Sequence, residues 1–396
     1  MTDRRPRRDG RRRSVKLAVL TTAVSVLLAG GVVAELELLL RAHYAAKSYA
    51  GARASVPHPF LQVRSKGAVD HVNQHGFRGD AMKVPKPAGE LRIVTLGGST
   101  TLGVNNPYED TWPRQLEKRL RARAPEARVQ VQNAGASWWT SLHSLIDYQA
   151  RVSTFEPDVV IIMHGINDLC RSFSPPWWAV GPFQPDYSHY LGPYIQLLGT
   201  RRTAADPSIS VLWDRVRMSL LGEPNPYRTD AQGVRALRAS MREAEIDEFP
   251  SLSRYRRYLT MLAEQVQRDR HALLVLSHPS IYRPDLSDDE RSRLWFGPVF
   301  CAQDGRFPSD ESMRHGMQQF NVVAEAVATD QGAAYLDVAS SVPKDLIHFS
   351  DDVHLSGAGN AVVAQAVADE LLSQGMVGAA TSRAVADGRA HADRVR

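Results

Sequence analysis

Apolar residues along the chain follow two different spacings. Runs of apolar residues that end at turn residues predict β-strands at 91–96, 129–133, 159–163, 272–276 and 334–338. Between these runs, apolar residues recur at the period of a helix with one buried face. The predicted helices contain Trp112, Leu116 and Leu120; Tyr255, Leu259, Leu262 and Val266; Phe320, Val323, Ala324 and Val327; and a last helix covers 357–372. Strands that alternate with helices predict an α/β fold with a parallel sheet covered on both faces.

The region 171–250 interrupts this alternation. It is longer than the usual connections in compact domains. Its aromatic residues are Trp177, Trp178, Tyr187, Tyr190, Tyr194 and Trp213. Because ligands of open α/β sheets bind at the carboxyl ends of the strands, we interpret 171–250 as an insertion over that edge of the sheet.

An uncharged, mostly apolar run occupies residues 17–34. A helix rises about 1.5 Å per residue, so a run of this length reaches across a hydrocarbon core of about 30 Å. Basic residues precede the run and none lies within it, which favours a cytoplasmic N-terminus. Residues 32–34 also fit a signal-peptide cleavage site, but leucines continue the apolar pattern to residue 40. We predict a transmembrane signal-anchor at 17–41 with the body outside the cytoplasm; a cleaved secretory signal is the alternative.

The excess of basic residues belongs to the N-terminal segment and not to the body. The chain has 396 residues, of which 43% are hydrophobic, and a formal net charge of +5. Residues 1–16 contain seven Arg, one Lys and two Asp, so they alone carry +6 and the remainder sums to −1. A basic cytoplasmic tail explains this charge without nucleic acid as a partner. Residues 42–89 are predicted to form a polar connector and residues 376–396 a disordered tail.

The chain contains two cysteines, Cys170 and Cys301. They show neither the spacing of a metal site nor the framework of a disulfide-rich domain. An oxidising compartment would allow one disulfide between them. Two buried free thiols are the alternative, and the sequence leaves both open.

Three predicted strands end in residues that suit acyl transfer. This chemistry needs a nucleophile, a base, a group that orients the base, and donors for the oxyanion. Ser99 follows two glycines after a strand, where its hydroxyl and its N–H would be exposed. Gly135 follows the next strand and lets a backbone N–H approach a ligand closely. Asn167 follows the strand 159–163 and carries a neutral amide that is able to donate to an oxyanion. Alone, each of these residues is also typical of a turn.

A carboxylate and a histidine occur together near the C-terminus. Asp351 and His354 are three positions apart, so one turn brings their side chains within reach. The carboxylate would accept the ring N–H and hold the tautomer that receives the proton of Ser99. We predict that Asp351, rather than Asp352, has this role. The N-terminus of the helix that follows is expected to favour a neutral imidazole.

Together, these positions resemble the four blocks of the SGNH/GDSL hydrolases. The residues that match the four letters of the family name are Ser99, Gly135, Asn167 and His354. The Asp-x-x-His ending of the last block, which begins here at Asp351, is also similar to the family.

The resemblance covers roughly residues 73–170 and 252–373. The sequence Gly-Phe-Arg-Gly at 76–79 is similar to a stretch that recurs in envelope-anchored bacterial members. Gly98 departs from the eponymous motif, which has Asp at this position. An α/β-hydrolase fits less well, because its Gly-x-Ser-x-Gly turn would need a glycine where Thr101 stands.

The resemblance implies a flavodoxin-like three-layer α/β/α sandwich with a central parallel sheet, here over 90–375. It implies neither metal nor cofactor. The site residues that it implies are a triad of Ser99, His354 and Asp351, and an oxyanion hole formed by the N–H groups of Ser99 and Gly135 and the side chain of Asn167.

We predict a serine esterase that hydrolyses acyl esters, above all O-acetyl groups, on an envelope glycan. Indole rings suit the apolar faces of sugars, and the candidate substrate contacts are Trp138, Trp139, Trp177 and Trp178. Three alternatives stay open: an O-acyltransferase on extracytoplasmic polysaccharide; a lipid esterase or lysophospholipase whose aromatic residues meet the membrane interface; and a non-catalytic envelope scaffold.

Overall fold

The computed structural model describes residues 7–51, 55–58, 60–65, 71–176, 178–192 and 230–378. These residues form two compact units. Residues 7–51 belong to the first unit, and all the other described residues belong to the second.

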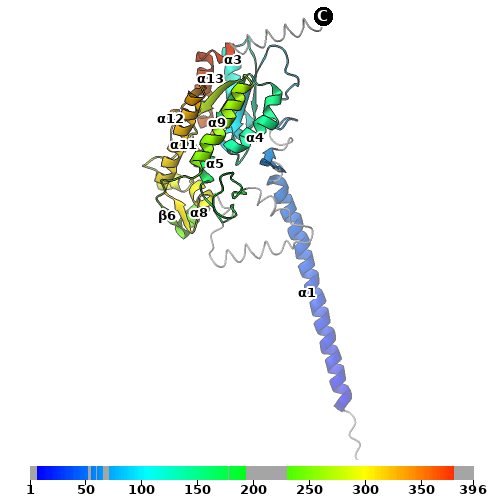
Figure 1. Ribbon diagram of the computed structural model, residues 1–396. Coiled ribbons are helices and arrows are strands. Elements are labelled where there is room, and N and C mark those ends of the chain that lie inside the picture. The colour runs from blue at the N-terminus through cyan, green and yellow to red at the C-terminus, as the bar shows by residue number, and fades with distance from the viewer. Residues whose placement is uncertain are drawn as a thin grey trace, which may run out of the picture. The chain divides into compact units, whose positions relative to one another are not determined.

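The described residues of the first unit form one long helix, α1 (Arg7–Gly51), which is coloured blue in Figure 1. Its stretch Lys16–Leu40 has a mean hydropathy of 2.2, and none of it is buried. By length and composition, this stretch is able to cross a membrane. The helix continues past residue 41, where the sequence predicts the connector.

The second unit is built on a parallel sheet. Its strands are β3 (Glu90–Gly97), β4 (Arg128–Asn133), β5 (Val159–Met163), β7 (Ala272–Leu276) and β9 (Ala334–Leu336). Their order in the sheet is β4-β3-β5-β7-β9, and all neighbouring pairs are parallel. This is the order of a flavodoxin-like doubly wound sheet. The strands predicted from apolar runs are confirmed.

Helices cover the sheet as two outer layers (Figure 1). In one layer α3 (Trp112–Arg123) packs against α13 (Gly357–Ser373), and in the other α9 (Leu252–Arg268) packs against α4 (Ser141–Ala150) and α11 (Asp310–Asp330). The apolar face of α3 buries Trp112, Leu116 and Leu120. The side chain of Asn360 on α13 accepts the N–H of Trp112 at 3.0 Å, which satisfies a donor at the start of α3. The three-layer sandwich is confirmed.

Shorter elements complete the second unit. The short strands are β1 (Ser55–His58) and β2 (Gln62–Ser65), which are antiparallel, and β6 (Arg242–Ala244) and β8 (Arg306–Pro308), which are parallel. The short helices are α2 (Ser99–Leu102), η1 (Tyr108–Asp110), η2 (Val152–Phe155), α5 (Ile166–Cys170), α8 (Ala231–Ser240), α10 (Asp288–Arg291), η3 (Phe296–Phe300) and α12 (Val338–Ser341).

Within the region 171–250, the described residues contribute α8 and β6. Tyr187 and Tyr190 are buried there. Trp177, Tyr194 and Trp213 lie outside the described residues, and so does the C-terminal tail from residue 379.

Candidate active site

The four predicted blocks meet at the carboxyl edge of the sheet. Ser99 begins α2 directly after β3, Gly135 lies just beyond β4, and Asn167 lies in α5 after β5. His354 lies in the loop between α12 and α13. The strand order reverses beside β3, so these residues surround the crevice in which open α/β sheets bind ligands.

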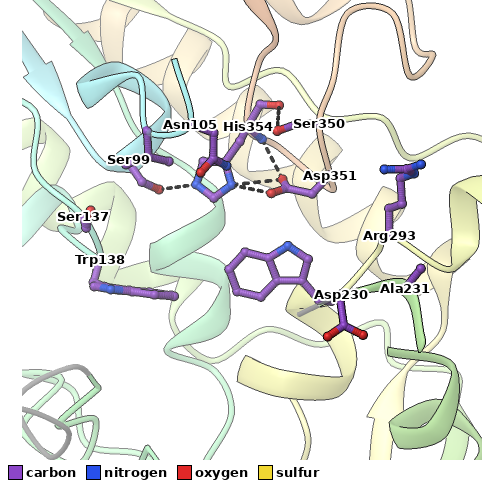
Figure 2. A pocket seen from close by; sticks show the side chains of 12 residues that line it. Ser99, Asn105, Ser137, Trp138, Asp230, Ala231, Arg293, Ser350, Asp351 and His354 are labelled. Carbon is purple, nitrogen blue, oxygen red and sulfur yellow. Dashed lines mark hydrogen bonds and ion pairs between the residues drawn. The ribbon is translucent and has the colours of Figure 1, made fainter. Parts of the chain in front are cut away.

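Hydrogen bonds join Ser99, His354 and Asp351 in a chain (Figure 2). Ser99 Oγ lies 2.7 Å from His354 Nε2. His354 Nδ1 lies 2.7 Å from Asp351 Oδ2 and 3.0 Å from Oδ1. The backbone N–H groups of Val353 and His354 also donate to Asp351 Oδ1, at 3.1 and 2.9 Å, and fix the carboxylate. With the Nδ1 proton donated to Asp351, Nε2 is left to accept the proton of Ser99.

Burial and charge act in opposite directions on His354. Burial alone lowers the pKa of His354, but the charge and hydrogen bond of Asp351, with a smaller contribution from Asp352, raise it above its ordinary value. At Asp351 burial raises the pKa, whereas the charge and hydrogen bonds of His354 lower it overall. The carboxylate of Asp351 therefore favours the protonated imidazole, in the direction opposite to the effect expected from the helix N-terminus.

Asp352 binds a different segment. Its carboxylate accepts hydrogen bonds from the Tyr282 hydroxyl and from the N–H groups of Trp295 (2.7 Å) and Phe296 (3.2 Å). Burial, together with the charge of Asp351, raises the pKa of Asp352 to about 7. These contacts support the prediction that Asp351 orients the histidine, and they show that Asp352 anchors the segment that carries Trp295.

Two hydrogen-bond donors lie beside the nucleophile. Ser99 is the first residue of α2, and its N–H donates to no residue in the described part of the chain. Asn167 donates to the carbonyl oxygen of Trp139 at 3.0 Å; its amide has a second N–H that is available for a ligand. A Cβ at Gly98 would lie 2.7 Å from Asn167 Nδ2. Gly98, which departs from the family motif, therefore leaves the space that the amide of Asn167 occupies.

The N–H of Gly135, unlike that of Ser99, already has a hydrogen-bond acceptor. Its N–H donates to Asn133 Oδ1 at 2.9 Å, so it is bound to a side chain in this structure. A Cβ at Gly135 would lie 2.6 Å from the backbone nitrogen of Leu102, so the position requires glycine for close packing. The oxyanion role that the resemblance implies for Gly135 would require Asn133 to release or share this N–H.

A pocket of about 480 Å³ opens over Ser99 and His354 (Figure 2). Its lining residues are Ser99, Val104, Asn105, Ser137, Trp138, Asp230, Ala231, Arg293, Trp295, Ser350, Asp351 and His354. The ring of Trp295 stacks against His354, with centroids 6.0 Å apart and planes 22° apart. The wall thus combines two indole rings with polar and charged side chains.

Of the predicted tryptophan contacts that the structure describes, Trp138 alone lines this pocket. Its φ is +69°, which is rare for a bulky residue, and the chain turns sharply here. Trp139 is 1% exposed and Trp178 is 2% exposed. Trp178 packs against Trp138, with ring centroids 4.8 Å apart. Trp139 and Trp178 are therefore core residues rather than pocket residues, and Trp177 lies outside the described residues.

Sequence reasoning missed several lining residues, including Asn105, Asp230, Arg293 and Trp295. Trp295 lies between β7 and α11 beside Phe296, in a segment rich in aromatic residues. That cluster was a usable signal, because connections that follow parallel strands line this edge of the sheet.

Cys170 and Cys301 lie next to each other, with their Sγ atoms 2.8 Å apart, and both are free thiols. Each is 1% exposed. In the ranges that the structure describes, no group of three or more His, Cys, Asp or Glu side chains is placed to hold a metal ion.

A serine, a histidine and an aspartate joined in this order at the edge of a flavodoxin-like sheet define a serine hydrolase of the SGNH type. Residues 95–362 match the profile of the GDSL-like Lipase/Acylhydrolase family, and the chain belongs to this family. It is accordingly a hydrolase that acts on ester bonds.

Several solved structures are similar to this chain. An acetylxylan esterase from Geobacillus stearothermophilus is 17% identical over 72% of this chain and 94% of its own, with a TM-score of 0.43. An alpha/beta hydrolase enzyme from the metagenome of Lake Arreo, Spain, is 18% identical over 74% of this chain and 98% of its own, with a TM-score of 0.41. A second acetyl xylan esterase is 13% identical over 71% of this chain and 99% of its own, with a TM-score of 0.39. No curated protein sequence matches the chain.

Proposed function

We propose that Ser99, His354 and Asp351 form the catalytic triad of an esterase that removes acyl groups, above all O-acetyl groups, from an envelope glycan. The observation that carries this proposal is the hydrogen-bonded chain, with 2.7 Å between Ser99 Oγ and His354 Nε2 and 2.7 Å between His354 Nδ1 and Asp351 Oδ2. Ser99 Oγ attacks the ester carbonyl carbon while His354 Nε2 accepts its proton. His354 returns this proton to the leaving sugar oxygen. His354 then takes a proton from a water molecule, whose oxygen attacks the acyl carbon. The bond between this carbon and Ser99 Oγ breaks, His354 returns the proton to Ser99 Oγ, and the carboxylic acid is released.

The oxyanion of this reaction needs donors that are in place before the charge forms. The N–H of Ser99 and the second amide N–H of Asn167 support this role by their position beside the nucleophile. Gly135 would contribute a third donor once Asn133 releases or shares its N–H.

The pocket supports a short acyl group on a hydroxyl-rich substrate. Trp138 and Trp295 provide indole rings that suit sugar faces, and Asn105, Asp230 and Arg293 provide polar groups among them. Such a mixture of apolar surface and a few polar groups fixes the orientation of a ligand. A long acyl chain would instead favour a continuous apolar wall. The apolar helix α1 supports a location at the cell envelope.

The nucleophile is tested with a fluorophosphonate probe on the full chain. We expect the probe to label the wild type, and Ser99→Ala to abolish both labelling and esterase activity. Loss of a triad member costs several powers of ten in rate. Labelling that persists in Ser99→Ala would place the nucleophile elsewhere, and a wild type that is neither labelled nor active would favour a non-catalytic scaffold.

The substrate class is tested by side-by-side assays on acetylated xylan, acetylated chitooligosaccharide, nitrophenyl acetate and long-chain lysophospholipid. We expect Trp138→Ala and Trp295→Ala to lower kcat/KM on the glycans by about 10-fold, because each removes one aromatic contact. The exposed Phe60, which does not line the pocket, offers Phe60→Ala as a control. A preference for lysophospholipid that both substitutions leave unchanged would contradict the glycan substrate.

Hydrolysis is distinguished from transfer by the products. The acyl-Ser99 intermediate would transfer its acyl group if a sugar hydroxyl replaced water. With an acetylated glycan and a hydroxyl acceptor present, we expect free acetate. An acetylated acceptor as the main product would instead identify an O-acyltransferase.

A further inference from the structure

Arg78 lies in the predicted connector and outside residues 95–362, which match the family profile. It is 5% exposed. Its Nη1 donates to the carbonyl oxygens of Leu102 (2.7 Å) and Gly103 (2.9 Å), and its Nη2 donates to that of Asn106 (2.8 Å). The planar guanidinium group presents several donors at fixed angles, which suits this set of acceptors. Arg78 therefore binds the backbone at the C-terminal end of α2.

Ser99 is the first residue of α2, which consists of four residues. Gly103 ends the helix in the left-handed conformation, with φ of 76°, and its N–H donates to the Ser99 carbonyl oxygen at 2.9 Å. The last carbonyl groups of a helix have no partner within it, and Arg78 supplies charged donors to two carbonyl groups here. Because α2 is about one turn long, a shift of its C-terminal end is transmitted to Ser99.

The same guanidinium group is connected to the loop of the histidine. Asn106, whose carbonyl oxygen it binds, donates its side-chain amide to the carbonyl oxygen of Leu355 at 2.8 Å. Leu355 directly follows His354. Arg78 therefore supports the backbone on both sides of the Ser99–His354 hydrogen bond.

Other contacts dock the loop that carries Arg78. Phe77 is fully buried, and its ring lies 4.2 Å from the guanidinium carbon of Arg151. Arg151 Nη1 donates to the carbonyl oxygen of His75 at 2.9 Å, and Arg151 Nε donates to Asp147 at 2.7 Å. Arg151 thus holds this loop while its hydrogen bonds go to residues outside α2, so it offers a matched control.

We propose that Arg78 is a positioning residue for the esterase reaction. It fixes the backbone that carries Ser99 and His354, and so keeps these side chains at the distance at which the proton moves between them. This proposal rests on the proposed roles of Ser99 and His354. A displacement of about 1 Å in an active site costs about 100-fold in rate, so loss of this support should appear in kcat.

The test compares Arg78→Lys, Arg78→Ala and the control Arg151→Ala in the full chain, at a temperature at which each variant is folded by circular dichroism. The measurements are kcat and KM on nitrophenyl acetate and the rate at which a fluorophosphonate labels Ser99. We expect Arg78→Ala to lower kcat and the labelling rate by about 10- to 100-fold, with KM nearly unchanged. Arg78→Lys should recover part of the loss, and Arg151→Ala should keep a kcat close to that of the wild type.

A folded Arg78→Ala with the kcat of the wild type would overturn the proposal. An equal loss in Arg151→Ala would also overturn it, because docking of the loop would then explain the effect. If Arg78→Ala does not fold, the proposal stands on a reduced kcat in Arg78→Lys and falls if that variant is fully active. Failure of the proposed triad is distinguishable, because the wild type would then be unlabelled at Ser99.

Discussion

Gly98 precedes the nucleophile, and its missing side chain leaves space for the amide of Asn167. A Cβ at this position would lie 2.7 Å from Asn167 Nδ2, which is closer than real Cβ atoms approach. We predict that Gly98→Ala displaces this amide and lowers kcat by about 100- to 1000-fold, as expected for loss of an oxyanion donor.

A double-mutant cycle checks this prediction. If Gly98→Ala acts through the amide, then Gly98→Ala and Asn167→Ala should be non-additive, and the double variant should be about as active as either single one. Gly357→Ala is the control, because the atoms nearest to a Cβ there are 3.7 and 3.9 Å away. A fully active, folded Asn167→Ala would remove this amide from the site.

The raised pKa of His354 predicts the pH dependence of the reaction. Protonated His354 cannot accept the proton of Ser99, so kcat/KM should be full above the pKa of His354 and fall as the pH drops through it. Asp351→Asn removes the charge that raises this pKa. The acid limb should therefore move to lower pH, while the plateau falls about 10,000-fold because the histidine loses its correct tautomer.

The pH profile of Asp352→Asn is the comparison for that of Asp351→Asn. Asp352 makes a smaller contribution to the pKa of His354, and its hydrogen bonds go to Tyr282 and the segment of Trp295. We expect a smaller shift of the acid limb and a smaller loss of rate. Greater damage from Asp352→Asn than from Asp351→Asn would show that the wrong aspartate has been assigned.

Strands with long apolar runs could be predicted from the sequence, and the shortest strands could not. The continuous apolar run 159–163 predicted the bounds of β5, because a strand buried on both faces needs apolar residues throughout. β6 and β8 have three residues each and are too short to show a period, so they were not predicted. The neighbours Trp138 and Trp139 look alike in the sequence, and only the left-handed turn at Trp138 separates the pocket residue from the core residue.

Cys170 ends α5 and Cys301 follows η3, so a bond between them would join two elements near the site. Their Sγ atoms are 2.8 Å apart and their positions are 131 residues apart. We predict that they form a disulfide in an oxidising compartment, with two protons and two electrons passing to a thiol oxidant such as an oxidised dithiol protein. The bond should stabilise the fold by about 2–4 kcal/mol.

Thiol titration and melting curves test the disulfide. Protein from an oxidising compartment should show no free thiol after denaturation, and reduction should lower its Tm by several degrees. Cys301→Ser should show the lower Tm with or without reductant. Two titratable thiols, together with the same gel migration before and after reduction, would show that the pair stays reduced.

At the scale of the molecule, the reacting groups come from distant parts of the chain. Ser99 and His354 are 255 positions apart and meet only because parallel strands bring their carboxyl ends to one edge. That rule applies to Ser99, Gly135 and Asn167, which follow β3, β4 and β5, whereas the place of His354 was predicted from the family resemblance. No comparable rule places Arg78, which lies in a loop before β3 and is linked by its side chain to α2 and to the residues after it across 24 to 28 positions. Its partners are backbone carbonyl groups, which carry no sequence signature.

The helix α1 precedes the hydrolase domain and contains the apolar stretch of the chain. The stretch Lys16–Leu40 of α1 has the length and hydropathy of a membrane span, and residues 1–16 carry a net charge of +6. We predict that it anchors the protein with its N-terminus in the cytoplasm. A reporter fused after residue 396 should be active only if it functions outside the cytoplasm, and the protein should stay in the membrane fraction at alkaline pH. Reporter activity in the cytoplasm would overturn this topology.

Cleavage and anchoring give different products. A cleaved signal would release a soluble protein whose N-terminus follows Ala34, whereas an anchor keeps the basic segment attached. Arginine near the centre of a membrane helix costs about 2.5–3.5 kcal/mol per residue. Leu27→Arg combined with Leu28→Arg should therefore block insertion of a signal and of an anchor alike.

An exchange at the end of the stretch, Leu39→Arg combined with Leu40→Arg, distinguishes a cleaved signal from a retained anchor. It lies beyond the cleavage site and shortens the apolar stretch at its outer end. If this second exchange releases the uncleaved protein from the membrane, residues 36–40 belong to the anchor. If the product is instead soluble, begins after Ala34 and is unchanged by the exchange, residues 1–34 are removed as a signal.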